Sequence, residues 1–263
     1  MAIDRGKLLE TVDSSGFLFQ VKVAQQFRES GLSTVLEEQH WVHPNGKYEG
    51  FADIVAISNR LRFVVECKRF RDAEWIFLTQ ERSFSQNRNK FYKISNYDSS
   101  NYPFRKWSEF GTHQKKIKEA NQCVMKRNGK DENLLESICT ILINSIEAIA
   151  QDEIQIRKDQ RGELIYIPMI VTTARLYLCE YNLNIIDINT GNLSINEISP
   201  TLESVPYIRF RKSLGIRSNE LVDSSSLKQL SLANERSILI IQAESLEGFL
   251  NSPGSLTVPT ENE

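Results

Sequence analysis

Three consecutive segments decide the fold of this chain: GFADIVAI at residues 50–57, SNR at 58–60 and LRFVVECK at 61–68. Each outer segment is an apolar run of strand length, and the polar break between them predicts a β-hairpin. Side chains alternate across a strand, so Glu66 and Lys68 share one face while Cys67 points to the other. If the turn is a two-residue loop at Asn59-Arg60, Asp53 lies directly opposite Glu66, whereas a change of one residue in loop length moves it to the wrong face.

Asp53, Glu66 and Lys68 would then converge on one spot of an otherwise apolar hairpin. Burying a charge is costly unless the charge is paired or binds a metal. Two carboxylates about one strand spacing apart can hold a hard cation such as Mg²⁺, whose other ligands are water and a phosphate oxygen. Lys68 would orient or help deprotonate the attacking water and counter the charge developing on phosphorus. The pattern therefore predicts a metal-dependent phosphodiesterase that uses Mg²⁺, with Mn²⁺ as a substitute.

The arrangement of Asp53 followed by Glu66-Cys67-Lys68 resembles the PD-(D/E)xK nuclease motif. In that family the Asp and the Glu bind magnesium and the Lys serves the nucleophilic water, so the resemblance implies the same roles here. Chance supplies the E-x-K tripeptide in many chains. Its place at the end of RFVV, after a GFADIV strand, is far more specific. The alternative from the residues alone is a turn-capping Asp53 and a structural Glu66–Lys68 pair without a metal.

The upstream segment GFLFQVKVAQQFRESG, residues 16–31, resembles the opening helix of Mrr-type restriction endonucleases. Ser14 or Ser15 can cap its start and Gly31 can close its end. Residues 34–42 follow as the expected first strand. The resemblance covers residues 14–70 well and implies a restriction-endonuclease-like core: an α/β fold with a mixed central sheet flanked by helices.

Gln20 stands where that family's helix carries a glutamate. Gln20 shares a helical face with Val23, Ala24 and Phe27, so we expect it to point at the sheet. A neutral amide can hydrogen-bond a metal-bound water but is a poorer ligand than a carboxylate. Gln20 is therefore included among the expected catalytic residues, with Asp53 and Glu66 as the metal ligands.

Composition fits one elaborated α/β domain over residues 1–251. The chain has 263 residues, of which 40% are hydrophobic and 25% charged. These fractions are typical of a globular protein. No apolar run is long enough to cross a bilayer, and the start lacks a signal-peptide core. The four cysteines lie far apart without a CxxC pair, which fits a reduced cytosol and argues against zinc. A cytoplasmic protein without a membrane partner is the expectation.

The charge is distributed unevenly. Residues 60–130 contain 17 Lys and Arg against 7 Asp and Glu, although the whole chain has a net charge of −2. A solvated helix face usually mixes both signs. Neutralised phosphates supply most of the affinity for a polyanion, so we assign this stretch to nucleic acid. The residues expected to bind nucleic acid are Arg69, Arg71, Arg88, Lys90, Lys115, Lys116 and Lys118.

The remaining elements follow from periodicity. Residues 82–130 are expected to be a basic insertion, with a long polar loop over 82–101 and a helix over 107–127. The loop's aromatic residues could stack on bases or pack on the domain. The other expected elements are a helix over 132–152, strands over 164–174, 176–179 and 237–242, a hairpin over 182–199, a short helix over 244–250 and a disordered tail over 252–263.

The leading hypothesis is a magnesium-dependent endonuclease. Resemblance to Mrr-type enzymes implies a bacterial restriction or antiphage defence role, with DNA favoured over RNA and a defence-system protein as a partner. A double-strand cut is most easily made by a dimer, so a homodimer is also expected. Two alternatives stay open: a repair or junction-resolving nuclease of the same fold, and a non-catalytic nucleic-acid-binding module.

Overall fold

The structure, a computed structural model, describes residues 4–80, 88–96, 104–111, 117–127, 130–132, 134–157, 162–193, 200–214 and 227–252. Its helices are α1 (Arg5–Ser14), α2 (Phe17–Glu29), α3 (Leu135–Ile156), α4 (Leu227–Ala233) and α5 (Leu246–Leu250), with short 3-10 turns η1 (Leu183–Ile185) and η2 (Ala243–Ser245). Its strands are β1 (Thr34–Val42), β2 (Glu49–Ser58), β3 (Leu61–Lys68), β4 (Ala73–Gln80), β5 (Arg88–Asn96), β6 (Phe104–Gly111), β7 (Glu119–Ala120), β8 (Gln122–Arg127), β9 (Lys130–Glu132), β10 (Gly162–Thr172), β11 (Arg175–Tyr181), β12 (Thr201–Ser204), β13 (Tyr207–Ser213) and β14 (Glu235–Gln242).

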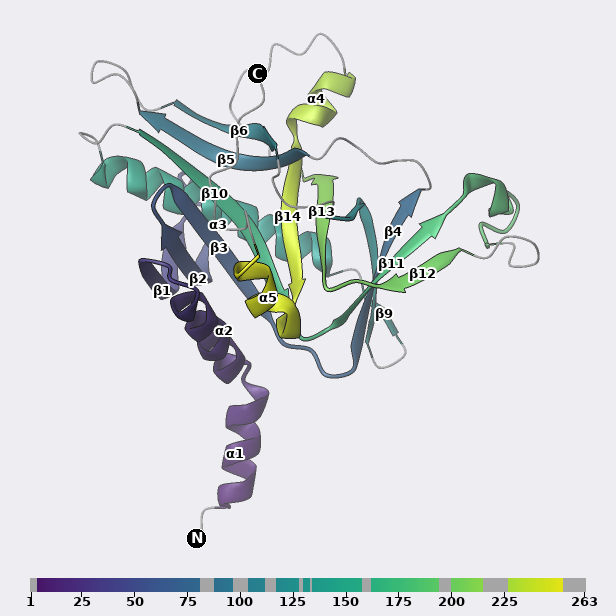
Figure 1. Ribbon diagram of the computed structural model, residues 1–263, viewed down its shortest axis with the longest axis horizontal. Coiled ribbons are helices and arrows are strands. Elements are labelled where there is room, and N and C mark those ends of the chain that lie inside the picture. The colour runs from purple at the N-terminus through teal and green to yellow at the C-terminus, as the bar shows by residue number, and fades with distance from the viewer. Residues whose placement is uncertain are drawn as a thin grey trace.

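The larger sheet is mixed, and its main path runs in the order β1-β2-β3-β10-β14-β13-β7 (Figure 1). The first three strands are antiparallel neighbours, and β10 lies parallel to both β3 and β14. The expected α/β class with a mixed central sheet is therefore confirmed. Strand β10, which is buried along almost its whole length, forms the centre of the sheet.

One edge of β10 changes partner along its length. Its first half, Gly162 to Tyr166, pairs antiparallel with β5, and its second half, from Met169 onward, pairs with β14. Pro168 lies between the two pairings. The amides of Ile165 and Thr173 both point toward β3, so by alternation the position of Pro168 points to the other edge. Proline has no backbone N–H to donate. Because no described strand pairs with this edge of β10 at Pro168, no ladder hydrogen bond is lost there.

A second sheet has the order β12-β11-β4-β8-β9. The parallel neighbours β3 and β10 continue through short corners into β4 and β11, which are again parallel neighbours. The hydroxyl of Thr173 joins the two corners because it accepts from the amide of Phe70 at 2.8 Å and donates to the Phe70 carbonyl. One buried apolar cluster contains side chains of both sheets, including Val64 and Trp75. The ends of β3 and β10 therefore lie at a fixed corner.

Helices cover both faces of the larger sheet (Figure 1). On one face, Val23, Ala24 and Phe27 of α2 pack with Ile54 and Phe63, next to α5. On the other face lies α3, whose apolar stripe has the spacing expected for an amphipathic helix. Its buried members are Leu135, Cys139, Leu142, Ile143 and Ile146. Helix α1 instead projects from the body and contains no buried residue.

Much of the expected secondary structure is confirmed. The first strand covers residues 34–42, the hairpin forms as expected, and α2 ends before Gly31, whose φ is +85°. The expected helix over 132–152 is α3, and the strands over 164–174 and 237–242 are β10 and β14. The strand over 176–179 is β11, and the short helix over 244–250 is η2 with α5. The expected serine cap of α2 is wrong: its N-cap is Gly16, without a side-chain cap hydrogen bond, although Ser15 Oγ accepts from the Phe17 amide at 3.2 Å.

Two further expectations are wrong. The described residues of 107–127, which exclude 112–116, do not form a helix: β6, β7 and β8 lie there instead. The apolar spacing of Ile117, Ala120 and Val124 suggested a helix, but pairing with strands distant in sequence decides the outcome, as in the pairs Tyr92–Trp107 and Trp75–Met125. The expected loop over 82–101 contains β5, whose Phe91 and Tyr92 are buried. Residues 81–87 and 97–103 lie outside the described parts of the chain.

The expected hairpin over 182–199 is present only as a turn. The single bridge Ile186–Leu193 closes it, and residues 194–199 are not described. The expected disordered tail also lies outside the described residues, apart from Ser252. Within the described residues, no helix is long and apolar enough to span a membrane.

Candidate active site

The register of the β2–β3 hairpin determines where the acidic side chains lie. The ladder runs from Ser58–Leu61 to Ile54–Val65, so the loop is the two-residue turn Asn59-Arg60. Asn59 has a φ of +44°, as the first central residue of such a turn requires. The next pair in this register is Asp53 with Glu66. The structure thus brings these two carboxylates together at the open end of the hairpin.

Two hydrogen bonds define the cluster. Asp53 Oδ2 accepts a hydrogen bond from the backbone N–H of Cys67 at 2.6 Å. Lys68 Nζ donates to Glu66 Oε2 at 2.7 Å. Glu66 itself is only 4% exposed, and among the residues that the structure describes its other oxygen, Oε1, is buried without a hydrogen-bond partner. A buried carboxylate oxygen without a partner is energetically costly, so this atom suits a ligand.

The pKa shifts show how strongly the three groups interact. Burial raises the pKa of Asp53, and the Cys67 amide and the Lys68 charge offset this only in part. Burial also raises the pKa of Glu66, Lys68 opposes the change, and the charge of Asp53 raises it further. Burial would lower the pKa of Lys68, but the negative charges of Glu66 and Asp53 outweigh it and raise the pKa. Two buried acids share one cation, so the cluster lacks positive charge.

Gln20 reaches this cluster from the opposite face of the sheet. It lies on α2, is 7% exposed, and its Nε2 donates to the backbone carbonyl of Asp53 at 2.9 Å. The β1–β2 ladder lacks the pair Glu38–Asp53, and Glu38 has a φ of +51°. The Gln20 amide therefore holds the main chain of Asp53 where the ladder is irregular. Gln20 points at the sheet as expected, and its contact makes it a positioning residue.

Strained backbone flanks the cluster on both sides. A positive φ is unfavourable for residues other than glycine. Besides Glu38, Asp72 has a φ of +51° just beyond the end of β3. Such strain persists only where the surroundings enforce it, and it is frequent at functional sites.

Arg69 and Arg71 follow directly after Lys68 and both contact α1. Their guanidinium groups lie 3.1 and 2.9 Å from the carboxylate of Asp13. Both arginines lower the pKa of Asp13, with the hydrogen bond from Arg69 as the largest cause. Asp13 is a residue near the site that sequence reasoning missed, because no periodic signal links a projecting helix to the corner after β3.

The other expected nucleic-acid contacts that the structure describes have partners of their own. Arg88 pairs with Glu109, and Lys118 pairs with Glu180 and Glu203. Lys90 is buried and donates to a backbone carbonyl. Lys115 and Lys116 lie outside the described residues. Three further cations, Arg209, Arg211 and Lys212 of β13, also lie in ion pairs, and Arg209 is 1% exposed.

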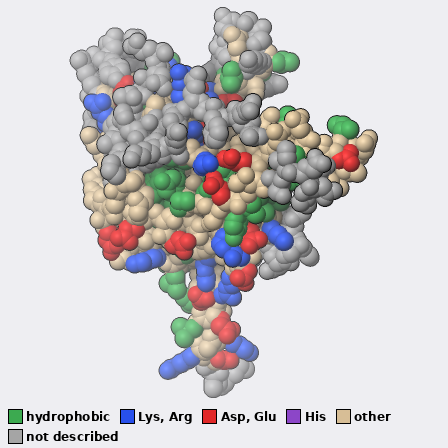
Figure 2. Space-filling model, turned by 45° about the vertical axis from the view of Figure 1, so that its right-hand side comes forward, with side chains coloured by type: hydrophobic (Ala, Val, Ile, Leu, Met, Phe, Trp, Pro, Cys, Tyr) green, Lys and Arg blue, Asp and Glu red, His purple; other side chains and the backbone are tan. Residues whose placement is uncertain are grey.

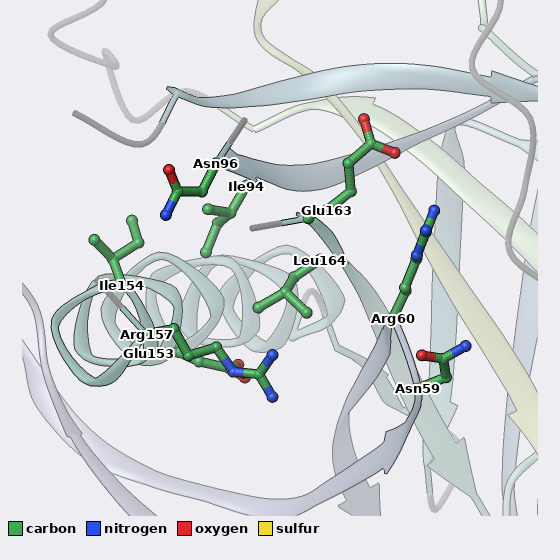
Figure 3. A pocket seen from close by; sticks show the side chains of 10 residues that line it. Asn59, Arg60, Ile94, Asn96, Glu153, Ile154, Arg157, Glu163 and Leu164 are labelled. Carbon is green, nitrogen blue, oxygen red and sulfur yellow. The ribbon is translucent and has the colours of Figure 1, made fainter. Parts of the chain in front are cut away.

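A cavity lies elsewhere, at the start of β3. It has a volume of about 170 Å³, and its lining includes Asn59, Arg60, Glu153 and Arg157 (Figure 3). Since β3 runs from Leu61 to Lys68, the cavity and the acidic cluster lie at opposite ends of this strand. The cavity is therefore separate from the candidate active site.

The acidic cluster offers two carboxylates for a cation. Within the described residues, no group of three or more His, Cys, Asp and Glu side chains could hold a metal ion. Two protein carboxylates nevertheless suit Mg²⁺, which keeps several waters and takes further oxygens from a substrate phosphate. Glu66 Oε1, which has no partner among the described residues, offers such a cation an oxygen, and a divalent cation bound there would favour the charged forms of both acids, whose pKa values burial raises. No protein-family model, curated protein or solved structure matches this chain.

Proposed function

We propose that this chain is a metal-dependent nuclease whose active site is formed by Asp53, Glu66 and Lys68. The observation that carries the proposal is the buried Glu66 Oε1, which lacks a hydrogen-bond partner among the described residues although Lys68 and Asp53 lie beside it. In a purely structural ion pair, both oxygens would be expected to have partners. The succession α2-β1-β2-β3 supports a restriction-endonuclease-like core.

Asp53 and Glu66 would hold the cation, and both are restrained for that task. The Cys67 amide fixes one oxygen of Asp53, and Lys68 fixes one oxygen of Glu66, so each acid keeps a second oxygen for a ligand. A bound divalent cation supplies a Lewis acid for a phosphate oxygen and makes water easier to deprotonate. Such a cation would also relieve the repulsion between the two buried acids.

Lys68 would act as a cation rather than as a base. Its pKa is raised above the ordinary value by Glu66 and Asp53 despite burial, so the ammonium group keeps its proton at neutral pH. Its side chain is 29% exposed, which lets it reach both the cluster and a substrate. It would orient the water that attacks phosphorus and counter the developing charge. Hydrolysis joins the water oxygen to phosphorus and breaks one P–O ester bond, and the leaving oxygen takes a proton.

The substrate that we propose is nucleic acid, with DNA favoured by the resemblance to Mrr-type enzymes. Arg69 and Arg71 support this because they follow shortly after Lys68 and, within the described part of the chain, form their ion pairs with the exposed Asp13, a contact that phosphates could replace. The same resemblance supports a role in bacterial restriction or antiphage defence.

The test is cleavage by the purified chain of plasmid, linear, branched and single-stranded DNA and of RNA, with Mg²⁺, Mn²⁺ or EDTA. We expect cleavage with either cation and none with EDTA. Preference for branched DNA would identify a repair or junction-resolving nuclease. Binding of nucleic acid without cleavage under any of these conditions would identify a non-catalytic module and contradict the proposal.

A further inference from the structure

The cavity at the start of β3 lies where four elements of the chain meet. It is lined by the turn before β3, the end of α3, the end of β5 and the start of β10 (Figure 3). Its volume of about 170 Å³ is close to the roughly 150 Å³ of an apolar cavity that holds one benzene molecule. The cavity is therefore large enough for a chemical group of about one ring.

Part of the cavity wall is apolar. Ile94 of β5 and Leu164 of β10 are buried, and Ile154 of α3 packs against the same apolar cluster. Because these side chains belong to packed elements, the apolar wall is held in place. An apolar group in contact with this wall would lose exposed surface, which favours binding.

Both acids that line the cavity already have cations as partners. Arg62 donates to both oxygens of Glu153, and Arg157 Nε lies 3.0 Å from the same carboxylate. Lys93 Nζ lies 2.7 Å from Glu163 Oε1. These acids are therefore compensated without a further cation.

Arg60 is the cation that these ion pairs leave over. Within the part of the chain that the structure describes, its guanidinium group has no ion pair and no hydrogen bond, and its backbone carbonyl accepts from the Ile165 amide at 2.9 Å. Four arginine and lysine side chains thus accompany two glutamates around the cavity, a surplus of two positive charges. A guanidinium group binds a carboxylate or a phosphate through two parallel N–H bonds.

We propose that this cavity binds a small organic anion, whose carboxylate or phosphate pairs with Arg60 and whose apolar group of about one ring contacts Ile94, Ile154 and Leu164. The cation alone would accept any anion, and the apolar wall alone would accept a neutral ring. The combination selects a ligand that has both parts. The site does not depend on the nuclease function, because it lies at the other end of β3 from the acidic cluster and its occupancy is measured without nucleic acid or metal.

The first experiment is a titration of the full chain with four probes, followed by saturation-transfer NMR. Benzoate and phenyl phosphate carry both parts, benzamide carries the ring without the charge, and inorganic phosphate carries the charge without the ring. We expect a millimolar dissociation constant for benzoate, phenyl phosphate or both, because ligands with so few atoms gain limited binding free energy. The tighter of the two identifies the anionic group.

Benzamide and inorganic phosphate should bind at least about tenfold more weakly than the preferred aromatic anion, since each lacks one part. Absence of binding by both aromatic anions would overturn the proposal. Binding of benzamide or of inorganic phosphate as tight as that of the aromatic anion would also overturn it.

The second experiment locates the anion with variants of the full chain. Arg60→Gln should weaken binding of the preferred aromatic anion by at least about tenfold, because it removes charge-assisted hydrogen bonds. Arg60 is exposed, so this change should leave the fold intact. The matched control is Arg5→Gln, which alters an exposed arginine of α1, the helix that projects from the body (Figure 2), and should leave binding unchanged.

Ile154→Phe tests the apolar wall while it keeps Arg60. The larger side chain fills part of the cavity and should also weaken binding, and thermal unfolding checks that the variant folds. Binding by Arg60→Gln as tight as by the parent and by Arg5→Gln would overturn the proposal, whatever the result for Ile154→Phe.

Discussion

The half-buried Glu153 of α3 and the buried Glu66 of β3 lie near opposite ends of β3 and differ in their hydrogen-bond partners. Near its start, Arg62 donates to both oxygens of Glu153 at 3.0 and 3.1 Å, and Tyr166 Oη donates to Glu153 Oε2 at 2.7 Å. Near its end, Glu66 has Lys68 on one oxygen and no hydrogen-bond partner within the described chain on the other. Arg62 and Glu66 share one face of β3 because side chains alternate.

The pKa values of the two acids shift in opposite directions. Burial raises the pKa of Glu153, but hydrogen bonds from Arg62 and Tyr166 outweigh it, and the net pKa is lowered. For Glu66 burial prevails over Lys68, and the net pKa is raised. The difference teaches that burial of an ion pair does not identify a functional site. A completed set of partners indicates a structural role, whereas an incomplete set indicates a place for a ligand. Five predictions test or sharpen this comparison.

The largest effect is expected from Lys68→Ala. If Lys68 counters charge on the phosphate, its loss should reduce the cleavage rate by about 10³-fold, as for other groups that stabilise developing charge. Nucleic-acid affinity should change little, because one phosphate contact among many is a small share. Lys93→Ala is the matched control, since Lys93 makes a lysine–glutamate contact of the same 2.7 Å with Glu163. Cleavage at the parent rate by Lys68→Ala would make Lys68 structural.

A large effect on stability is expected at the other end of β3. Arg62 is 1% exposed, and Arg62→Ala leaves Glu153 without its main partner. Removing one member of a buried ion pair costs about 3–5 kcal/mol in the free energy of unfolding. Denaturant titration should show this loss for Arg62→Ala and a much smaller one for the part-exposed Lys68→Ala. Equal losses would mean that both pairs are structural and that the comparison fails.

Cation binding should directly distinguish the role of Glu66 from that of Glu153. Mn²⁺ at about 100 times its dissociation constant should stabilise the parent by about 2.7 kcal/mol, measured by thermal unfolding. Glu66→Gln and Asp53→Asn should lose most of this gain, whereas Glu153→Gln should keep it although its own stability is lower. Stabilisation of Glu66→Gln by Mn²⁺ to the parent extent would remove the metal site from the cluster.

The pH dependence of stability should have opposite signs at the two glutamates. A lowered pKa means that Glu153 stabilises the fold above its unfolded pKa and that this stability is lost as pH falls through the folded pKa. A raised pKa means that Glu66 favours the fold in its protonated form, and this contribution is lost as pH rises through the folded pKa. At neutral pH without metal, Glu66→Gln should therefore be neutral or stabilising and Glu153→Gln destabilising. Unfolding curves from acid to neutral pH measure both, and equal signs would contradict the assignment.

A smaller effect is expected from Gln20→Ala, which sharpens the same comparison from the opposite face of the sheet. The loss removes the hydrogen bond to the Asp53 carbonyl, a contribution of about 0.5–1.5 kcal/mol. Because Gln20 positions Asp53, cation affinity should fall with turnover, by severalfold. Gln25→Ala on the exposed side of α2 is the control. Reduced stability with unchanged turnover and cation affinity would assign Gln20 to packing alone.

The sequence by itself determined the hairpin and the cluster on it. Asp53 and Glu66 face each other because a two-residue loop and a side-chain period of two fix the register locally. The apolar pattern of a few neighbouring residues likewise predicted the boundaries of β1 and the orientation of Gln20 toward the sheet. These features depend on neighbours in sequence, so their physics is visible in the sequence.

Only the tertiary structure decided the features that depend on distant partners. The described parts of residues 104–127 contain strands because β5 pairs with β6, β13 with β7 and β4 with β8, which no local period reveals. Described basic residues of this segment form ion pairs with acids distant in sequence, as Lys118 does with Glu180, because ion pairs depend on distance in space. Whether both oxygens of Glu66 and of Glu153 have hydrogen-bond partners depends likewise on which elements pack against β3. Local alternation can thus place a charged side chain on a face, but only packing determines whether its partners are complete.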